Sequence, residues 1–487
     1  MLQFPRPEGG RPRRGARQAL LLFSAALLLA ARAGADTASL AQRVDAAIAG
    51  LGPHTLSAVR VVELPQGDVL YERNADLSMN PASNMKLLTS AAALAHLGPD
   101  YRFTTRVLQT GKRSGSTLAG DLILQGGGDP VLETKDLERL ADAVKAGGIR
   151  VVTGALRVDD SRYDRRRLGT GWEADDESYY YAAQVSALSV NSNVMKVDVL
   201  PAARAGAPVT VKQSPIPGYA ALAERPLTGS ADTKSDLDVM RLRGRNALKI
   251  TGTIGVGGRP LREVEVTVEE PQRFAGALFR QLLAQRGVKV AGPVRDLPAP
   301  DSARALTSLT SPPLSRLVSL LNKPSNNLIA EMLLKEIGYR EKGKGDTHTG
   351  SEVLEDWLAK LGVPAGGVLV NDGSGMSRHD LVTARAVSEL LVKARAQPWG
   401  PVFTESLPVM GVDGTLRSRL KGTSAEGKIQ AKTGTLSHVT ALSGYATSRD
   451  GKRRVFSILI NHHPGPTGGA NGAKRAEDAI ALALVEE

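Results

Sequence analysis

The sequence predicts an α/β (α+β) protein in which both ends of the chain form one mixed unit and a β-rich segment is inserted between them. Three observations lead to this prediction. A run dense in Leu and Ala follows position 83, three strand patterns and a helix close the chain after position 428, and residues 101–300 read mainly as Val, Thr and Gly-rich strands. We therefore expect residues 36–100 and 301–487 to form one domain, with 101–300 as inserted, nested modules.

Sequence patterns predict the helices and strands of the main unit and of the inserted segment. The last helix has no aromatic residue, so we expect it to pack on the sheet, with at most peripheral contact to a membrane. In the inserted segment one helix stands out, at 274–286, among strands such as 119–124, 248–254 and 263–268. Elsewhere the patterns predict a helix at 37–50, a hairpin of strands 56–63 and 68–73, a helix at 85–97, helices from 314, strands at 428–435, 439–446 and 455–461, and a helix at 472–484.

The first 35 residues have the composition of a secretory signal peptide. Five arginines precede an apolar run from Ala19 to Ala31, and Ala33-Gly34-Ala35 fits a small-residue cleavage site. The run of 13 residues is too short to span a bilayer. We therefore expect an exported protein, by either the general or the twin-arginine route. The chain has no cysteine, which excludes a lipoprotein anchor and disulfides, so its stability must come from a large core.

The charge of the chain argues against a nucleic-acid partner. The formal net charge is +12, and removal of residues 1–35, with six arginines and one glutamate, lowers it by five. The remaining basic residues are scattered and aromatic residues are sparse, so an anionic cell-wall polymer is the simpler partner. The seven histidines show no metal-ligand spacing, and we expect no metal and no cofactor.

A serine and a lysine three residues apart open the first predicted helix. Residues i and i+3 share one helix face, so Lys86 would lie beside the hydroxyl of Ser83 and could remove its proton. A lysine acts as a base only when its pKa is lowered, so Lys86 would need both partial burial and a second cation nearby, and Lys432 is the candidate for that cation. The same spacing occurs at Ser418 and Lys421, but there it lies in a charged, solvated run, so Ser83 is the candidate nucleophile.

Two further polar strings complete the candidate site. Ser325-Asn326-Asn327 stands where one predicted helix ends and the next begins, a position that can push Ser325 and Asn327 into a cleft. Similar Ser-x-Asn strings at Ser78 and Ser189 lie before the nucleophile and in a strand-like stretch, respectively. Lys432-Thr433-Gly434 lies in an alternating strand, where glycine often marks the close approach of a ligand backbone. A peptide could add to this strand, with Lys432 facing its carboxylate.

In combination and in this order, the three strings resemble those of penicillin-binding proteins and serine β-lactamases. Residues 371–378 and 407–416 resemble the two Asp-Gly loops of peptidase family S13, the D-alanyl-D-alanine carboxypeptidases/endopeptidases of the DacB type. Most β-lactamases keep the first two motifs close, whereas Ser83 and Ser325 are 242 positions apart. The resemblance implies a β-lactamase/transpeptidase-like domain, an antiparallel sheet flanked by helices, with inserted β-rich domains.

The S13 resemblance also implies a reaction and a role for each motif residue. Ser83 would attack the carbonyl between two D-alanines of a peptidoglycan stem peptide and form an acyl-serine, which water then hydrolyses; β-lactams would acylate the same serine in the periplasm. Endopeptidase activity would cleave D-Ala cross-links. The implied roles are base for Lys86, proton relay for Ser325, positioning for Asn327, electrostatics for Lys432, and substrate binding for Thr433, Gly434 and Thr435, with the backbone N–H groups of Ser83 and Thr435 meeting the oxyanion.

Three further residues are candidates through the same resemblance. Arg378, in the Ser-Gly-x-Ser-Arg loop, would grip the far end of the stem peptide, and Asp159 and Tyr163 would overhang the cleft from the insertion. For the last two, an edge strand followed by a turn is the alternative. The competing functions are a β-lactamase and a non-catalytic wall-binding or penicillin-sensing protein. The sequence leaves open the oligomeric state, the balance of the two peptidase activities, and the division of proton transfer between Lys86 and Ser325.

Overall fold

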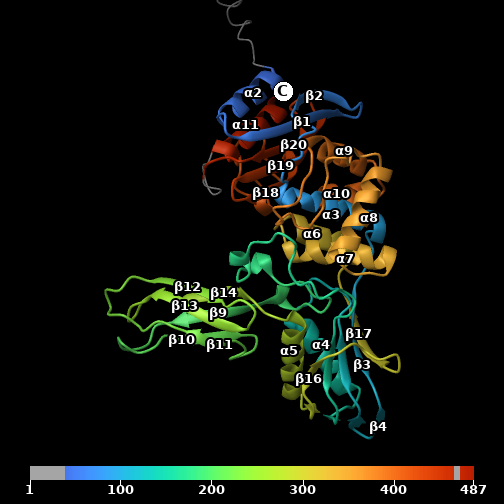
Figure 1. Ribbon diagram of the computed structural model, residues 1–487, viewed down its shortest axis with the longest axis vertical. Helices are drawn as coiled ribbons and strands as arrows, with labels where there is room; N and C mark the ends of the chain where they lie inside the picture. The colour runs from blue at the N-terminus through green and yellow to red at the C-terminus, as the bar shows by residue number, and fades with distance from the viewer. Residues whose placement is uncertain (1–38, 466–471) are drawn as a thin grey trace, which may run out of the picture.

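The computed structural model describes residues 39–465 and 472–487 (Figure 1). The predicted signal peptide and its cleavage site lie outside the described residues. Within those two ranges, no helix is both long enough and apolar enough to cross a membrane. The chain forms a mixed sheet-and-helix unit from which two further bodies extend, one built around α4 and α5 and one formed by β9 to β14 (Figure 1).

The main unit is centred on a five-stranded sheet with the order β18-β19-β20-β1-β2, in which every neighbouring pair is antiparallel. Both faces of the sheet are covered, so side chains on alternate positions enter two different cores. In β1, Val59 and Val61 pack toward one core, while Ala58 and Val62 pack toward the other. The strands are β1 (Leu56–Leu64), β2 (Asp68–Arg73), β18 (Ile429–Leu436), β19 (Val439–Thr447) and β20 (Arg453–Asn461).

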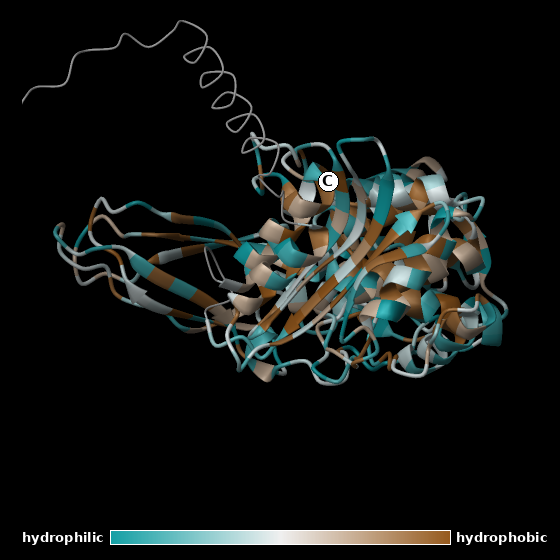
Figure 2. Cartoon of the chain, turned by 90° about the horizontal axis from the view of Figure 1, so that it is seen from above, coloured by the Kyte–Doolittle hydropathy of each residue, from teal (hydrophilic) through white to brown (hydrophobic). Residues whose placement is uncertain are grey.

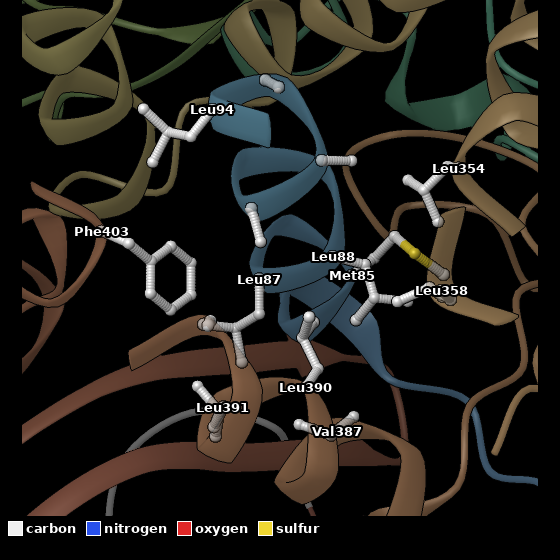
Figure 3. Packing of buried hydrophobic residues seen from close by; sticks show 14 of the residues in the cluster. Met85, Leu87, Leu88, Leu94, Leu354, Leu358, Val387, Leu390, Leu391 and Phe403 are labelled. Carbon is white, nitrogen blue, oxygen red and sulfur yellow. The ribbon is translucent and has the colours of Figure 1, made fainter. Parts of the chain in front are cut away.

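Helices cover the two faces of this sheet. Helices α2 (Leu40–Ala49) and α11 (Gly472–Glu486) pack together on one face. On the other face, α3 (Met85–Leu97) lies buried among helices, with Leu87 on the side of Phe403 and Leu391 and Met85 on the side of Leu354 and Leu358 (Figure 3). The neighbours are α6 (Leu314–Asn322), α7 (Asn327–Lys342), α8 (Thr347–Lys360), α9 (Ala384–Arg395) and α10 (Gly400–Ser406). The predicted helices and strands of the main unit are therefore confirmed, with shifts of a few residues at their ends.

The first inserted body combines two small sheets with two helices. One sheet has the order β16-β8-β6-β3-β17 and the other β15-β7-β5-β4. Its helices are α4 (Thr134–Ala146) and α5 (Pro271–Gln285). Its strands are β3 (Thr104–Gln109), β4 (Lys112–Ser114), β5 (Thr117–Ala119), β6 (Leu122–Gln125), β7 (Val151–Val152), β8 (Leu156–Asp159), β15 (Lys289–Val290), β16 (Val294–Asp296) and β17 (Arg304–Thr310).

The structure corrects three predictions in this body. The expectation of one helix was wrong, because α4 is a second one, with Leu137, Leu140 and Val144 buried at helical spacing between charged residues. The strand predicted at 119–124 is two strands in different sheets, because the chain turns at Gly120, where a Cβ atom would lie 2.2 Å from the carbonyl oxygen of Thr110. The predicted boundary after residue 300 was also wrong, because β17 pairs with β3 of the insertion.

The second inserted body is a projecting lobe of strands. Its two small sheets have the orders β10-β9-β14 and β11-β13-β12. In the view from above, apolar and polar residues alternate along this lobe, while apolar residues concentrate in the central sheet (Figure 2). That this lobe is a nested module remains a proposal. Its strands are β9 (Val194–Leu200), β10 (Thr210–Ser214), β11 (Ala221–Glu224), β12 (Asp236–Arg241), β13 (Ala247–Thr253) and β14 (Leu261–Thr267).

Candidate active site

Ser83 lies in a short 3₁₀ turn, Ala82–Asn84, that leads directly into α3. The turn packs against β18 and β19, and the side-chain amide of Asn84 donates to the hydroxyl of Ser443 on β19 at 2.8 Å. Ala82 has a left-handed backbone (φ 44°). This unusual conformation sets the direction in which the chain enters the helix and places Ser83 at the mouth of a cavity.

The side chain of Lys86, which follows Ser83 by three residues, is fully buried. Its Nζ lies 2.8 Å from Oγ of Ser83, 2.6 Å from Oδ1 of Asn327 and 2.6 Å from the carbonyl oxygen of Ser374. Burial lowers the pKa of Lys86 to about 8, although nearby carboxylates, Asp372 first among them, oppose the change. Near neutral pH, about a tenth of Lys86 is therefore an uncharged amine able to take a proton.

Lys432 and Ser325 form a second contact between a lysine and a serine, similar to the contact between Lys86 and Ser83. Nζ of Lys432 donates to Oγ of Ser325 at 2.8 Å and to the carbonyl oxygen of Thr433 at 2.9 Å. Burial holds the pKa of Lys432 well below its usual range, and repulsion from Lys86 adds to the effect. Of the two causes expected for the lowered pKa of Lys86, burial is present, whereas Lys432 is not among the causes; the repulsion between the two lysines lowers the pKa of Lys432 instead.

The loop between α6 and α7 presents Ser325 and Asn327 to the two lysines. Asn326 caps α7 by accepting the backbone N–H of Ile329 at 3.0 Å, which frees its neighbours for other contacts. Ser325 has a left-handed backbone (φ 64°) that turns its hydroxyl toward Lys432. The side-chain amide of Asn327 donates to the carbonyl oxygen of Tyr181 at 2.8 Å, so this residue bridges Lys86 and the insertion.

Strand β18 forms the opposite wall at the edge of the sheet. Gly434 packs so closely on the serine turn that a Cβ atom there would lie 2.7 Å from the carbonyl oxygen of Pro81. Thr433 shares a hydrogen bond of 2.8 Å with Thr415, and Thr435 lines the cavity. The strand thus brings Thr435 to the cavity that Ser83 lines, and Lys432 to the hydroxyl of Ser325.

These walls enclose a cavity of about 360 Å³ with Ser83, Ser325, Asn327 and Thr435 in its lining. Arg378 also lines it; its guanidinium donates to Glu173 at 3.0 Å and to the carbonyl oxygen of Ser437 at 2.8 Å. Sequence reasoning missed four lining residues from the insertion: Glu173, Asp176, Tyr180 and Tyr181. The run of three tyrosines at 179–181 was a visible signal, since aromatic residues make up only 4% of this chain.

The structure places Asp159 and Tyr163 away from this cavity. Asp159 is buried at the end of β8 and accepts hydrogen bonds from Gln125 and from the backbone N–H of Ala299. Tyr163 is buried and donates to Glu336 of α7 at 3.0 Å. Asp159 thus makes its contacts within the insertion, and Tyr163 contacts α7 of the main unit. Neither side chain lines the cavity, so their predicted contact with substrate is withdrawn.

Buried carboxylates beneath Lys86 also escaped the sequence analysis. Glu331 of α7 accepts the backbone N–H groups of Gly373 and Ser374 at 3.0 and 2.8 Å. Burial and the neighbouring Asp372 raise the pKa of Glu331 to about 8. Asp372 in turn accepts the indole N–H of Trp172 at 2.8 Å. These contacts fix the loop whose Ser374 carbonyl meets Lys86.

Comparison with known proteins identifies the family. Residues 40–484 match the D-Ala-D-Ala carboxypeptidase 3 (S13) family. The chain belongs to peptidase family S13. A D-alanyl-D-alanine carboxypeptidase of Actinomadura sp. (strain R39) is 40% identical to this S13 chain over 99% of the chain and 92% of the relative. The S13 relative D-alanyl-D-alanine carboxypeptidase DacB of Haemophilus influenzae is 26% identical over 81% of the chain and 83% of the relative.

Solved structures agree with the S13 assignment and with the predicted β-lactamase/transpeptidase-like fold. The crystal structure of penicillin binding protein 4 (dacB) from Haemophilus influenzae superposes on this S13 chain with a TM-score of 0.81 and 25% identity, covering 91% of the chain and 98% of the relative. A structure of the same protein complexed with a β-lactam gives a TM-score of 0.76 and the same coverage, at 23% identity, which supports the fold alone.

Proposed function

We propose that this S13 protein is a serine-type D-Ala-D-Ala carboxypeptidase that works through an acyl-serine. The observation that carries the proposal is the contact of Ser83 Oγ with a buried Lys86 whose pKa is lowered to about 8. A hydroxyl beside a partly neutral amine, at the mouth of a cavity, is an activated nucleophile. The carboxypeptidase relatives support the choice of substrate, a stem peptide ending in D-Ala-D-Ala.

Acylation begins when uncharged Lys86 takes the proton of Ser83. Oγ then bonds to the carbonyl carbon of the penultimate D-alanine, and the oxyanion accepts the backbone N–H groups of Ser83 and Thr435. As the C–N bond breaks, the leaving nitrogen receives a proton through the hydroxyl of Ser325, and free D-alanine departs. Lys432, which donates to Ser325, keeps this hydroxyl in place. The terminal carboxylate of a bound substrate would favour the charged form of this lysine.

Deacylation uses the same groups in reverse. A water molecule loses its proton toward Lys86 or Ser325 and attacks the ester carbon, after which Ser83 recovers its proton. Asn327, 2.6 Å from Lys86, would hold the lysine and contact the amide of the acyl chain. Arg378 and the residues from Glu173 to Tyr181 would contact the far end of the stem peptide.

The same chemistry extends to two further reactions. A β-lactam offers a strained amide to Ser83 and would leave an acyl-enzyme; a structure of the Haemophilus relative is complexed with a β-lactam. Endopeptidase cleavage of a D-Ala cross-link differs only in the amine that leaves. We assign both reactions to this site, and we place the enzyme in the periplasm, since residues 1–35 have the composition of a signal peptide.

The test is to measure D-alanine release from a pentapeptide and labelling by fluorescent penicillin with protein lacking residues 1–35. We expect Ser83→Ala to abolish both. Ser418→Ala is the matched control, because Ser418 has the same spacing to a lysine but is exposed, and it should keep both activities. Labelling that survives in Ser83→Ala would refute the assignment of Ser83 as the nucleophile. Labelling of the wild type without D-alanine release would favour a penicillin sensor, and rapid loss of the label would favour a β-lactamase.

A further inference from the structure

The second Asp-Gly loop, residues 407–416, has no role in the proposed mechanism, yet it contacts two elements of the active site. The loop follows α10, and its backbone pairs with the start of β18. There the N–H of Ala431 donates to the carbonyl oxygen of Pro408 at 2.9 Å. Because β18 continues from Ala431 to Lys432, the loop is fixed to the strand that carries this lysine.

The same loop binds Lys323, which lies two residues before Ser325 in the connection between α6 and α7. Nζ of Lys323 donates to Oδ2 of Asp413 at 2.5 Å and to the carbonyl oxygen of Leu407 at 3.1 Å. The other carboxylate oxygen of Asp413 accepts the backbone N–H of Val409 at 2.9 Å. Asp413 therefore ties the side chain of Lys323 to the backbone of the loop.

The loop holds the backbone of Lys323 as well as its side chain. The carbonyl oxygen of Lys323 accepts the N–H of Thr415 at 3.0 Å. Gly414 has a left-handed backbone (φ 57°), and a Cβ atom there would lie 2.6 Å from the same carbonyl oxygen, so this close approach requires glycine. The hydroxyl of Thr415 shares a hydrogen bond of 2.8 Å with Thr433, which follows Lys432 in β18. Thr415 thus joins the α6–α7 loop to β18.

We propose that the second Asp-Gly loop sets the 2.8 Å contact between Lys432 and Ser325, and that Asp413 is its positioning residue. The inference rests on the proposed function, in which Ser325 passes a proton to the leaving nitrogen. Lys432 and Ser325 are 107 positions apart, so only tertiary contacts can fix their separation. Ser325 also has a left-handed backbone, which persists only where the surrounding structure holds it. The contacts of the loop with Lys323 supply that support.

Asp413 acts on the reaction through Lys323 and not by contact with the substrate. It lies outside the lining of the active-site cavity, and 37% of its side chain and 29% of that of Lys323 are exposed. An ion pair with this exposure contributes little to the free energy of unfolding. A small displacement of a catalytic hydroxyl, in contrast, lowers a rate by a large factor. Loss of the pair should therefore slow the reaction far more than it lowers the melting temperature.

The experiment compares an amide and an ester substrate: a peptide ending in D-Ala-D-Ala and its analogue ending in D-Ala-D-lactate. An amine leaves the tetrahedral intermediate only after its nitrogen is protonated, whereas the ester releases a much better leaving group. The amide of the variant Asp413→Asn can still accept the N–H of Val409. In this variant we expect kcat/KM to fall by about tenfold for the peptide and by less than about threefold for the ester.

Two further variants test the pair and its place in the fold. Lys323→Met removes the other partner and should cause the same selective loss, and combining it with Asp413→Asn should slow the enzyme no further. Asp198→Asn is the matched control. Asp198 lies on β9 of the lobe and makes the same two kinds of contact, accepting the N–H of Glu263 at 2.8 Å and the guanidinium of Arg262 at 3.0 Å. Its substitution should change neither rate.

The outcomes separate this inference from the proposed function. Equal losses on both substrates in Asp413→Asn, or no loss in either Asp413→Asn or Lys323→Met, would overturn the role of the loop. Ser325→Ala tests the mechanism itself and should lose the peptide rate selectively. A selective loss in Ser325→Ala without one in Asp413→Asn would overturn the loop alone. If Ser325→Ala slowed both substrates alike, or if the wild type released no D-alanine, the proposed function would be wrong, and the inference with it.

Discussion

At the scale of single residues, the site consists of two buried lysines that each contact one serine hydroxyl. Lys86 lies 2.8 Å from Ser83, and Lys432 lies 2.8 Å from Ser325. Two ammonium groups cannot both stay charged in a buried site at low cost, so at least one of them loses its proton readily. This arrangement supplies a base near neutral pH without a histidine.

The lowered pKa of Lys86 predicts how acylation depends on pH. Because the uncharged amine is the base, the fraction able to react rises from about a hundredth at pH 6 to about nine tenths at pH 9. We expect the second-order rate of penicillin acylation to rise with pH and to level off above about 8. The measurement is stopped-flow acylation between pH 6 and 9; a flat profile would contradict Lys86 as the base.

Two variants serve as controls for this profile. Lys86→Arg cannot lose its proton and should fail to acylate at any pH in the range. Glu331→Gln removes a carboxyl group that, with its pKa raised to about 8, becomes negatively charged in the upper part of this pH range and then favours protonated Lys86, while the amide oxygen of the variant can still accept the N–H groups of Gly373 and Ser374. The midpoint should therefore move to lower pH, and a shift to higher pH would exclude this electrostatic role of Glu331.

At the scale of elements, the site depends on how closely β18 approaches the serine turn. The turn at 82–84 and the strand come from opposite ends of the chain, and Gly434 is the point where they meet. A side chain there would push on Ala82 and on the backbone of Pro81, so the strand and the serine would move apart. The width of the active-site opening is thus set by one glycine.

Gly434→Ala tests this contact. Its Cβ atom would lie 2.7 Å from the carbonyl oxygen of Pro81, so backbone must shift, at a cost of about 1–3 kcal/mol in the free energy of unfolding. We expect a lower melting temperature and an acylation rate reduced by about tenfold or more. Gly366→Ala, where a Cβ atom meets nothing within 4 Å, is the matched control. Equal behaviour of the two variants would show that the close contact is unimportant.

At the scale of the whole molecule, α7 joins the catalytic unit to the first inserted body. Glu336 of this helix is fully buried and accepts hydrogen bonds from Arg162, Tyr163 and Tyr101. The same helix begins at Asn327 in the active site, so the insertion is anchored to the element that positions the catalytic amide. The walls that the insertion contributes to the cavity therefore have a fixed position relative to Ser83.

Glu336→Ala should weaken this joint. It leaves the partly buried Arg162 without its carboxylate, and breaking such a pair costs about 3–5 kcal/mol when it is fully buried, and less here because Arg162 keeps some access to solvent. We expect a clear fall in melting temperature and faster proteolysis between the bodies. Glu352→Ala is the control: it breaks an exposed ion pair between Glu352 of α8 and Lys342 of α7, and it should have little effect.

A double variant distinguishes the ion pair from general damage to the core. Arg162→Met with Glu336→Leu removes both charges and should lose less stability than the two single changes combined, because neither partner is left unpaired. Additive losses in thermal or denaturant unfolding would mean that Arg162 and Glu336 do not depend on each other.

Local pattern in the sequence was enough to predict the main elements and the candidate nucleophile. The Leu and Ala run after Ser83 and the alternation around Lys432 follow from helical and strand periodicity, and both elements are where they were expected. The order and spacing of the motifs were enough to predict the family. Helix α4 was missed although its periodicity was present, because charged residues separate its apolar positions.

The tertiary structure determined the features that depend on which groups lie close together in space. Sequence spacing could not show which of the two expected causes, burial or Lys432, lowers the pKa of Lys86, since burial is a property of the packed core. It could not show that Asp159 and Tyr163 are buried, that Glu331 lies beneath the site, or that β17 returns to the insertion. The sequence thus determined which chemical groups are available, and only the folded chain determined which of them meet, because pKa values and reactivity depend on separation in space.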